Sequence, residues 1–425
     1  MKYINSDVTV IGAGASGLMA GICFLRELKK QKKFKRIILL DHMDRVGKKI
    51  LVTGNGRCNL TNRNIDLRSY HSNHLEIAKN ILDKFDYSAT IKFFNSIGLE
   101  IVEDSSGRIY PRSNQASSVL DLMRLEFKTI GGDEIINFKT KSIKKQGLMF
   151  KISSEEKVIN SSKVIISTGG LTNISQGCDG SGYLYLKKFG HEFIKTFPSL
   201  TQIKVSDKIV KSLKGMRTFC NISVVADGKK LKEEQGELQF TDIGLSGICT
   251  FQISRMVSEF TLFGTINNRK YNSIKISVDL FPELKYEDVI SFINKRILLH
   301  PNMTLENFFI GVLNKRIGQA LVKTCNFSLC KKVSDLSNEE ILFLSKKLKF
   351  WEFSPISAMG YKNAQVTAGG IDLFGFNKDT LESKKIKNLY ACGEVLDVDG
   401  DCGGFNLQWA WSSGYVAGLN ASMEI

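Results

Sequence analysis

Val8-Thr-Val-Ile-Gly12-Ala-Gly14-Ala-Ser-Gly17 places three glycines at GxGxxG spacing directly after a short β-branched strand. In this spacing Gly12 allows a tight turn, Gly14 lets backbone amides approach a pyrophosphate, and Gly17 lets the following helix pack on the sheet. The N–H groups that begin such a helix favour a negatively charged ligand. The run therefore predicts a dinucleotide site whose phosphates contact Gly12, Gly14, Ala15, Ser16 and Gly17.

The sequence that follows agrees with this interpretation, because it supplies the helix and the second strand that the site requires. Residues 18–28 carry apolar side chains at helical spacing, and Arg36-Ile-Ile-Leu-Leu-Asp41 is a buried-strand pattern that ends in an acid. Asp41 lies 24 residues beyond Gly17, close to the spacing of about 20 residues that is typical of the carboxylate on a nucleotide ribose. We therefore expect Asp41 to bind the ribose.

A glycine-rich polar loop, Gly54-Asn-Gly-Arg-Cys-Asn-Leu-Thr-Asn62, follows the segment Gly47-Lys-Lys-Ile-Leu. Its composition does not fit an amphipathic helix or strand, and loops of this kind often lie against ligands. A solvated turn is the alternative explanation. The candidate cofactor contacts in this region are Lys48, Gly56, Arg57 and Asn59.

Two further strand patterns end in small or acidic residues. The first is Lys163-Val-Ile-Ile-Ser-Thr-Gly-Gly170, and the second is Ile386-Lys-Asn-Leu-Tyr-Ala-Cys-Gly-Glu394, which precedes a predicted helix at 409–421. Glycine at the carboxyl end of a parallel strand lets the backbone touch a cofactor, and a helix that opens on glycines points its positive dipole at an electron-rich group. The candidate residues are Thr168, Gly169, Gly170, Gly393, Glu394, Asp397, Gly404, Asn406 and Gln408.

The segment between these strands has a different sequence pattern. Short alternating segments from 203 to about 277 predict antiparallel β structure, and a helical pattern with a break at His300-Pro301 follows. We therefore predict an α/β Rossmann-like nucleotide-binding domain in two parts, 1–196 and 354–425, interrupted by an inserted domain at 197–353. The insert is expected to be a β-barrel with a helical sub-insert at about 284–325.

Composition limits the class of protein. The chain of 425 residues is long enough for two or three domains, and no apolar stretch reaches the ~18 residues that a membrane span needs. We expect a cytoplasmic protein without a signal peptide. The formal charge of +16 could indicate a nucleic-acid surface, but the lysines are spread along the chain, so nucleic-acid binding is the less favoured interpretation.

The nine cysteines and five histidines do not form a recognisable metal or disulfide pattern. One pair, Cys325 and Cys330, has the CxxxxC spacing of flavin-linked disulfide reductases, but it lies far from the predicted nucleotide site. Two buried thiols are the simpler explanation, and a redox role stays open. We predict no metal site, and no residue is singled out as catalytic.

With these motifs, the chain resembles the predicted flavoproteins of the aminoacetone oxidase and bile-acid reductase family, relatives of the glutathione-reductase type of FAD-binding proteins. The resemblance covers almost the full length and rests on a series of ordered motifs. These are the GxGxxG run, Gly54-Asn-Gly-Arg-Cys-Asn, Arg108-Ile-Tyr-Pro111, Thr168-Gly-Gly, Gly244-Leu-Ser-Gly247 and the block from Tyr390 to Ala410. Departures from the family pattern include Asp41 in place of Glu, Ser181 in place of Asp and Ile248 in place of Pro.

The resemblance implies FAD as the cofactor. It places the pyrophosphate on the glycine run, the adenosine ribose on Asp41, the ribityl arm near Gly393 and Glu394, and the isoalloxazine near Asn406. A flavin supplies the electron chemistry itself, which agrees with the absence of a catalytic triad in the sequence.

We therefore expect an FAD-dependent oxidoreductase acting on a small organic substrate. NAD(P)H is the possible reductant and O2 the possible acceptor, although no second GxGxxG is present. The alternatives are a basic RNA-associated flavoprotein and a flavin-binding scaffold without turnover. The sequence implies no protein partner.

Overall fold

The computed structural model describes residues 2–423, which form two compact units. Unit 1 contains the chain up to Thr196 and again from Val366 onward. Unit 2 is Phe197–Gln365. The chain thus leaves the first unit once, builds the second, and returns.

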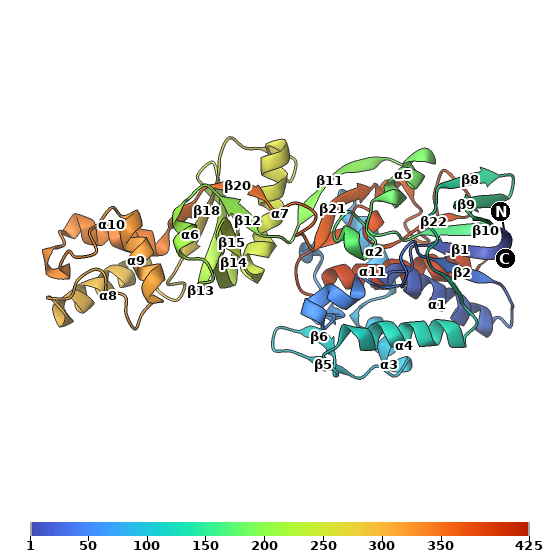
Figure 1. The fold of residues 1–425 in the computed structure, drawn as a ribbon, viewed down its shortest axis with the longest axis horizontal. Coiled ribbons are helices and arrows are strands. Elements are labelled where there is room, and N and C mark those ends of the chain that lie inside the picture. Colours follow the sequence, from blue (N-terminus) through green and yellow to red (C-terminus); the bar gives the residue numbers. More distant parts are fainter. Residues whose placement is uncertain (1, 424–425) are drawn as a thin grey trace. The chain divides into compact units, whose positions relative to one another are not determined.

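Unit 1 is built on a largely parallel sheet (Figure 1). Strand β1 lies between β2 and β10, and β7 and β22 extend the sheet on either side, all in parallel. β8 and β9 form an antiparallel hairpin on the first half of β10. The strands are β1 (Lys2–Ile11), β2 (Ile37–Leu40), β7 (Asp133–Ile135), β8 (Ser142–Gln146), β9 (Met149–Ser153), β10 (Lys157–Ile166) and β22 (Leu389–Ala391).

Helices and short strands complete unit 1. The helices are α1 (Ala15–Lys30), α2 (Leu75–Lys84), α3 (Tyr87–Ser96), α4 (Ala116–Thr129), α5 (Ser181–Lys188) and α11 (Phe405–Ala421). The short strands are β3 (Thr61–Asn62), β4 (Tyr70–His71), β5 (Ile101–Glu103), β6 (Arg108–Pro111), β21 (Val366–Ile371) and β23 (Asp399–Gly400). Strand β11 (Phe193–Ser199) pairs with β21, and its last three residues belong to unit 2.

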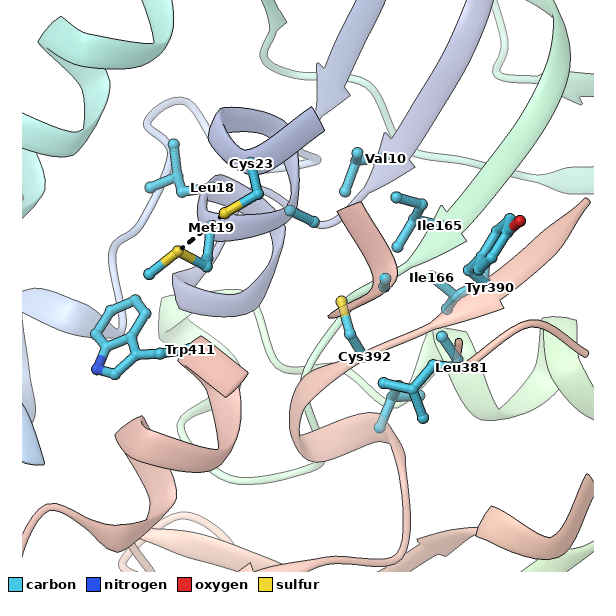
Figure 2. Close-up of a cluster of buried hydrophobic side chains, with 14 of the residues drawn as sticks. Val10, Leu18, Met19, Cys23, Ile165, Ile166, Leu381, Tyr390, Cys392 and Trp411 are labelled. Carbon is cyan, nitrogen blue, oxygen red and sulfur yellow. Dashed lines mark hydrogen bonds between the residues drawn. The ribbon is translucent and has the colours of Figure 1, made fainter. Parts of the chain in front are cut away.

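The parallel strands form the core of unit 1 because their side chains are apolar on both faces, as expected of a sheet covered on each side. All four residues of β2 are buried. Figure 2 shows Val10 of β1 and Ile165 of β10 in one hydrophobic cluster with Met19 of α1 and Trp411 of α11. Burying each large side chain of this kind stabilises the fold by about 1.5–3 kcal/mol.

Helices α1 and α11 approach one another more closely than side chains would allow. A Cβ atom added to Gly414 would lie 2.4 Å from the Ser16 carbonyl oxygen, and one added to Gly418 would lie 2.1 Å from that of Ala20. These two glycines therefore let the α11 backbone pack directly on α1. The contact places the first turn of α1 beside the middle of α11, whose N-terminus lies nine residues before Gly414.

Unit 2 contains one antiparallel sheet, in the order β19-β18-β13-β14-β15-β12-β20. The predicted barrel closure stays a prediction, because the described residues show no pairing between the end strands β19 and β20. The strands are β12 (Ile203–Val205), β13 (Arg217–Ala226), β14 (Lys229–Phe240), β15 (Gly244–Ser246), β18 (Ile274–Asp279), β19 (Trp351–Phe353) and β20 (Pro355–Ala358), and a small hairpin is formed by β16 (Thr265–Ile266) and β17 (Arg269–Lys270).

Three features of unit 2 differ from the sequence prediction. Residues 248–263 form helix α7 (Ile248–Phe263) within the predicted β segment, because Cys249, Ile253 and Val257 recur every four residues and are buried on one face. The helical insert continues beyond 325 to Lys349. Residues 354–365 belong to unit 2, since β20 pairs with β12. The other helices are α6 (Ile209–Ser212), α8 (Tyr286–Leu299), α9 (Lys315–Thr324) and α10 (Asn338–Lys349).

Candidate functional site

The glycine run forms the turn between β1 and α1. Gly12 has φ +101°, and a Cβ atom there would lie 2.4 Å from the Ser167 carbonyl oxygen. A Cβ atom on Gly17 would lie 2.0 Å from the Gly12 carbonyl oxygen. Gly14 is different, because no described atom lies within 4 Å of an added Cβ. Two of the glycines thus close the turn, and the third borders open space.

The first turn of α1 has backbone donors to offer to a ligand. The first N–H group of the helix to bond a carbonyl is that of Leu18, which donates to Gly14. Among the described residues, the N–H groups of Gly14, Ala15, Ser16 and Gly17 meet no acceptor. Unpaired amides at a helix N-terminus favour anions. The open space beside Gly14 is therefore suited to a phosphate group.

Asp41 lies at the end of β2, next to the glycine turn. Its carboxylate accepts hydrogen bonds from the Ala13 N–H (3.2 Å) and from the Met43 N–H (2.9 Å). Burial raises the pKa of Asp41, while the hydrogen bonds from Met43 and Ala13 oppose this shift. The structure thus brings the predicted ribose acid and the predicted phosphate loop together.

The turn after β10 packs against the turn after β22. Gly169 has φ +72°, and a Cβ atom on Gly170 would lie 2.4 Å from Thr367 Oγ1 and 2.8 Å from Glu394 Oε1. Thr168 Oγ1 is buried and has no hydrogen-bond partner among the described residues. The three predicted residues 168–170 therefore lie at the carboxyl edge of the sheet, close to Glu394.

Gly393 connects β22 to both helices. It has φ +80°, and an added Cβ atom would lie 2.3 Å from Ser16 Oγ at the start of α1. Its N–H group donates to Ser413 Oγ (2.9 Å), and its carbonyl accepts from Trp409 Nε1 (3.1 Å), both on α11. Gly393 and Ser16, 377 residues apart in the sequence, are thus neighbours at this edge.

Glu394 is bound by protein groups. Its carboxylate contacts Lys49 Nζ (2.6 Å), accepts from the Thr367 N–H (2.9 Å) and lies 3.3 Å from Thr172 Oγ1. Lys49 Nζ also donates to Thr172 Oγ1 (2.9 Å). Burial by itself would lower the pKa of Lys49, but Cys178 and Glu394 outweigh it, so the net shift is upward. The pair is a half-buried salt bridge with a charged lysine.

The N-terminus of α11 lies against the polar loop. A Cβ atom on Gly404 (φ +101°) would lie 2.7 Å from the Thr61 carbonyl and 2.9 Å from Asn59 Oδ1, which is itself buried without a partner in the described part of the chain. No described acceptor meets the N–H groups of Phe405, Asn406 and Leu407. This is a second helix N-terminus with free donors in unit 1, and it borders the polar loop.

The side chains of Asn406 and Gln408 are engaged within the protein. Asn406 bonds both the N–H (2.8 Å) and the carbonyl (2.7 Å) of Gly400 and so closes its own loop. Gln408 is fully buried, and its amide is saturated by hydrogen bonds with Thr61, Thr90, Phe85 and Ser412. Neither side chain has the freedom expected of a cofactor contact, because both stabilise the polar loops around α11.

Four other residues predicted to contact the cofactor are held by other groups of the protein or lie at its surface. Lys48 pairs with the exposed Asp44 (2.5 Å), and its charge also opposes the upward shift in the pKa of Asp41. Arg57 is exposed and stacks on the Tyr110 ring at 4.6 Å, beside Gly56 (φ +83°). Asp397 is buried and accepts from the Asn73 N–H (3.0 Å).

Sequence reasoning missed Lys49, because it is adjacent to Lys48 and nothing in the pattern shows which of the two points inward. It also missed Ser167, Thr172 and Thr367, since single hydroxyl residues carry no signal of their own.

The described residues contain no cluster of His, Cys, Asp or Glu suited to a metal ion. Cys325 and Cys330 are both free thiols, the first buried and the second exposed, and burial raises the pKa of Cys325 to about 11. Among residues 2–423, no helix combines the length and the apolar character needed to cross a membrane.

The family model described as the HI0933-like protein Rossmann domain matches residues 6–420. The chain belongs to this family. A 3-dehydro-bile acid delta(4,6)-reductase of Clostridium scindens is 35% identical over 415 residues, covering 98% of each chain. A ribosomal RNA dihydrouridine synthase of Escherichia coli is 28% identical over 415 residues, covering 96% of each. Membership of this family, together with the named reductase, identifies the protein as an FAD-dependent oxidoreductase.

Among solved structures, a quinol-fumarate reductase with menaquinol molecules is similar in fold, with a TM-score of 0.50 and 14% identity. The match covers 99% of this chain and 71% of that one. It supports the Rossmann-like α/β architecture of the HI0933-like chain. The residues at the carboxyl ends of the parallel strands of unit 1 fit FAD, because the first turn of α1 has free amides beside the open space at Gly14. The first turn of α11 adds free amides beside the polar loop.

Proposed function

We propose that the protein uses FAD to reduce a carbon–carbon double bond conjugated to a carbonyl group in a small organic substrate. The observation that carries the flavin part of the proposal is the pair of helix N-termini in unit 1, α1 and α11, whose first N–H groups are unpaired among the described residues. The bond type comes from the two relatives. Both names, a delta(4,6)-reductase and a dihydrouridine synthase, describe hydrogen added across a carbon–carbon double bond.

The residues of the edge divide among the parts of FAD. The first turn of α1 would hold the pyrophosphate, and Asp41 the adenosine ribose. Gly169, Gly170 and the Gly393 turn would line the ribityl arm. The free amides of α11 would face the electron-rich pyrimidine end of the isoalloxazine, where negative charge develops on reduction. Bound in this way, the flavin would supply the hydride, so the protein needs to orient the substrate and exclude water.

NAD(P)H is the reductant in this proposal. The test is an anaerobic absorbance spectrum of the purified protein before and after addition of NADH or NADPH, followed by an α,β-unsaturated ketone. We expect the flavin band to bleach with the nicotinamide and to return with the ketone. A flavin that stays oxidised would contradict a nicotinamide-driven reductase and would favour an oxidase fed by an organic donor. A protein that binds no FAD would overturn the proposal.

A second candidate function is reduction of uridine in RNA. It is favoured by the net charge of +16 and by the full-length match to dihydrouridine synthases of Escherichia coli and Haemophilus influenzae, the latter at 27% identity. The positive charge is divided equally, because each unit carries a net charge of +8. No single unit is thus an evident basic platform for RNA.

The two candidates differ in their dependence on salt. RNA binding that neutralises several phosphates weakens steeply as salt increases, whereas binding of a small neutral ketone does not. Incubation of reduced protein with unmodified ribosomal RNA, followed by mass spectrometry of the nucleosides, would reveal uridine that has gained two hydrogens. Its appearance with the wild type, but not with deflavinated protein, would make RNA the substrate.

A further inference from the structure

Lys49 is placed where four separate segments of unit 1 meet. It precedes the polar loop, and its ammonium reaches Glu394 after β22 (2.6 Å) and Thr172 after β10 (2.9 Å). Glu394 in turn accepts from the N–H of Thr367 on β21 (2.9 Å). The bonds of this pair therefore join segments that are up to 345 residues apart in the chain.

The same network fixes the turns that border the candidate cofactor site. The Leu171 N–H donates to Thr367 Oγ1 (2.8 Å), so the Gly169–Thr172 turn is held from both sides. Gly170 packs so closely on Thr367 and Glu394 that it has no room for a Cβ atom. A shift of the Glu394 carboxylate would therefore move the Gly170 backbone. Gly393 directly precedes Glu394 in the chain, so the same shift affects the Gly393 turn.

The pair is half-buried, since 22% of the Lys49 side chain and 20% of the Glu394 side chain are exposed. Removing one partner of such a pair leaves the other charge poorly compensated, which costs more than removing both. Arginine keeps the positive charge at this position and also donates to a carboxylate.

We propose that Lys49 is a positioning residue for the cofactor. Through Glu394 it holds the Gly169–Thr172 turn and the Gly393 turn in the arrangement that receives FAD. This inference rests on the proposed function, because it assumes that these turns line the FAD site.

Lys79 of α2 provides a matched control. It also forms an ion pair, with Asp83 on the same helix, and the two side chains are 58% and 59% exposed. The Lys79→Met and Lys49→Met variants therefore remove the same charge from unit 1. Only Lys49→Met removes a contact with the turns after β10 and β22.

The experiment measures the dissociation constant for FAD by titrating deflavinated protein, for the wild type and for K79M, K49M, K49R, E394Q and K49M/E394Q. Hydrogen exchange of residues 169–172 is measured on the same samples. We expect K49M to bind FAD at least tenfold more weakly and to exchange faster in this turn. K79M should stay within twofold of the wild type, and K49R within threefold.

The double variant separates a positioning role from two independent contributions. If Lys49 acts through Glu394, K49M/E394Q loses no more affinity than K49M, whereas losses that add would overturn the proposal. A folded K49M protein with wild-type affinity would also overturn it. If K49M does not fold, a folded K49M/E394Q protein with wild-type affinity does the same. Failure of the wild type to bind FAD would instead refute the proposed function, and the exchange of residues 169–172 would still report on the pair.

Discussion

Helices α1 and α7 begin in similar ways but border very different spaces. Each has 16 residues and follows a glycine, Gly14 in unit 1 and Gly247 in unit 2. At α1 the space beside the glycine is open and the first amides are free. At α7 the first turn contains the buried Cys249. Hydrogen bonds with Cys220 and with the Thr250 N–H lower the pKa of the Cys249 thiol. A glycine before a helix therefore does not by itself indicate a ligand site. The atoms that occupy the space beside the helix N-terminus decide whether a ligand fits there.

The largest expected effect comes from adding a side chain at a tightly packed glycine beside each of the two helices. In Gly17→Ala the added Cβ would meet the Gly12 carbonyl oxygen at 2.0 Å, and in Gly247→Ala it would meet that of Glu237 at 2.2 Å. Both clashes are with backbone, so each variant should lose about 3 kcal/mol or more of stability. We expect only G17A to lose FAD, as measured by the ratio of flavin to protein absorbance. Equal loss of FAD in both variants would remove the distinction between the two helices.

The next effect tests the open space directly. Gly14 is the N-cap residue of α1 with an extended backbone, so Gly14→Asp should keep or slightly raise stability, by about 0.3 kcal/mol. Its carboxylate would occupy the space for the pyrophosphate and repel it. We expect the dissociation constant for FAD to rise by about 100-fold, or about 2.7 kcal/mol.

A matched control for this variant exists at α4, whose N-cap residue is the exposed Gln115. Gln115→Asp adds the same capping carboxylate to another helix and should leave the affinity for FAD unchanged. Thermal unfolding of both apoproteins checks the folds. If G14D binds FAD as the wild type does, the phosphate does not lie at α1.

The two units should also respond differently to acid. His191 in unit 1 is buried, stacks on Phe376 (4.4 Å) and bonds Ser383 Oγ (2.8 Å). Burial, with a smaller contribution from Lys385, lowers its pKa to about 4. The unfolded state, with a pKa of about 6.5, then takes up the proton first, so stability falls as pH decreases from about 6.5 towards 4. Between about pH 7 and pH 5 the loss should be about 2 kcal/mol.

Urea unfolding with hydrogen exchange would assign this loss to unit 1. Unit 2 contains only one histidine, the exposed His300, and should not respond in this range. His191→Gln should flatten the pH dependence of unit 1, and His300→Gln should leave it unchanged. An equal acid response in both units would show that another group is responsible.

Much of the edge could be predicted from the sequence, because the constraint there is local. A β-branched strand followed by closely spaced glycines allows few other structures, so the turns at Gly12, Gly169 and Gly393 could be located from the pattern alone. The positions of the neighbouring acids Asp41 and Glu394 could be predicted because each stands at the end of a strand pattern. The α/β fold could be predicted for the same reason.

The remainder depends on tertiary packing. Lys48 and Lys49 are identical in type and adjacent, and only the fold turns one outward to Asp44 and the other inward to Glu394. Gln408 belongs to a polar motif, yet three partners from distant segments and Ser412 of its own helix saturate its amide inside the core. Helix α7 could not be predicted because its apolar residues stand among short alternating segments. No local sequence pattern indicates the tertiary contacts of Lys49 and Gln408.

The smallest expected effect concerns Arg57, the exposed cation of the polar loop. Its guanidinium stacks on Tyr110, and its Nε donates to the Gly54 carbonyl (3.3 Å), so it is held near the α11 end of the edge. An exposed cation–π contact contributes about 0.5–1 kcal/mol, and Arg57→Ala should therefore weaken FAD binding by no more than about fivefold. Arg112→Ala removes the same charge from another exposed position in unit 1 and provides the control. If R57A and R112A bind FAD equally well in the same titration, Arg57 does not contact the cofactor, and the flavin lies entirely within the space bounded by the two helix N-termini.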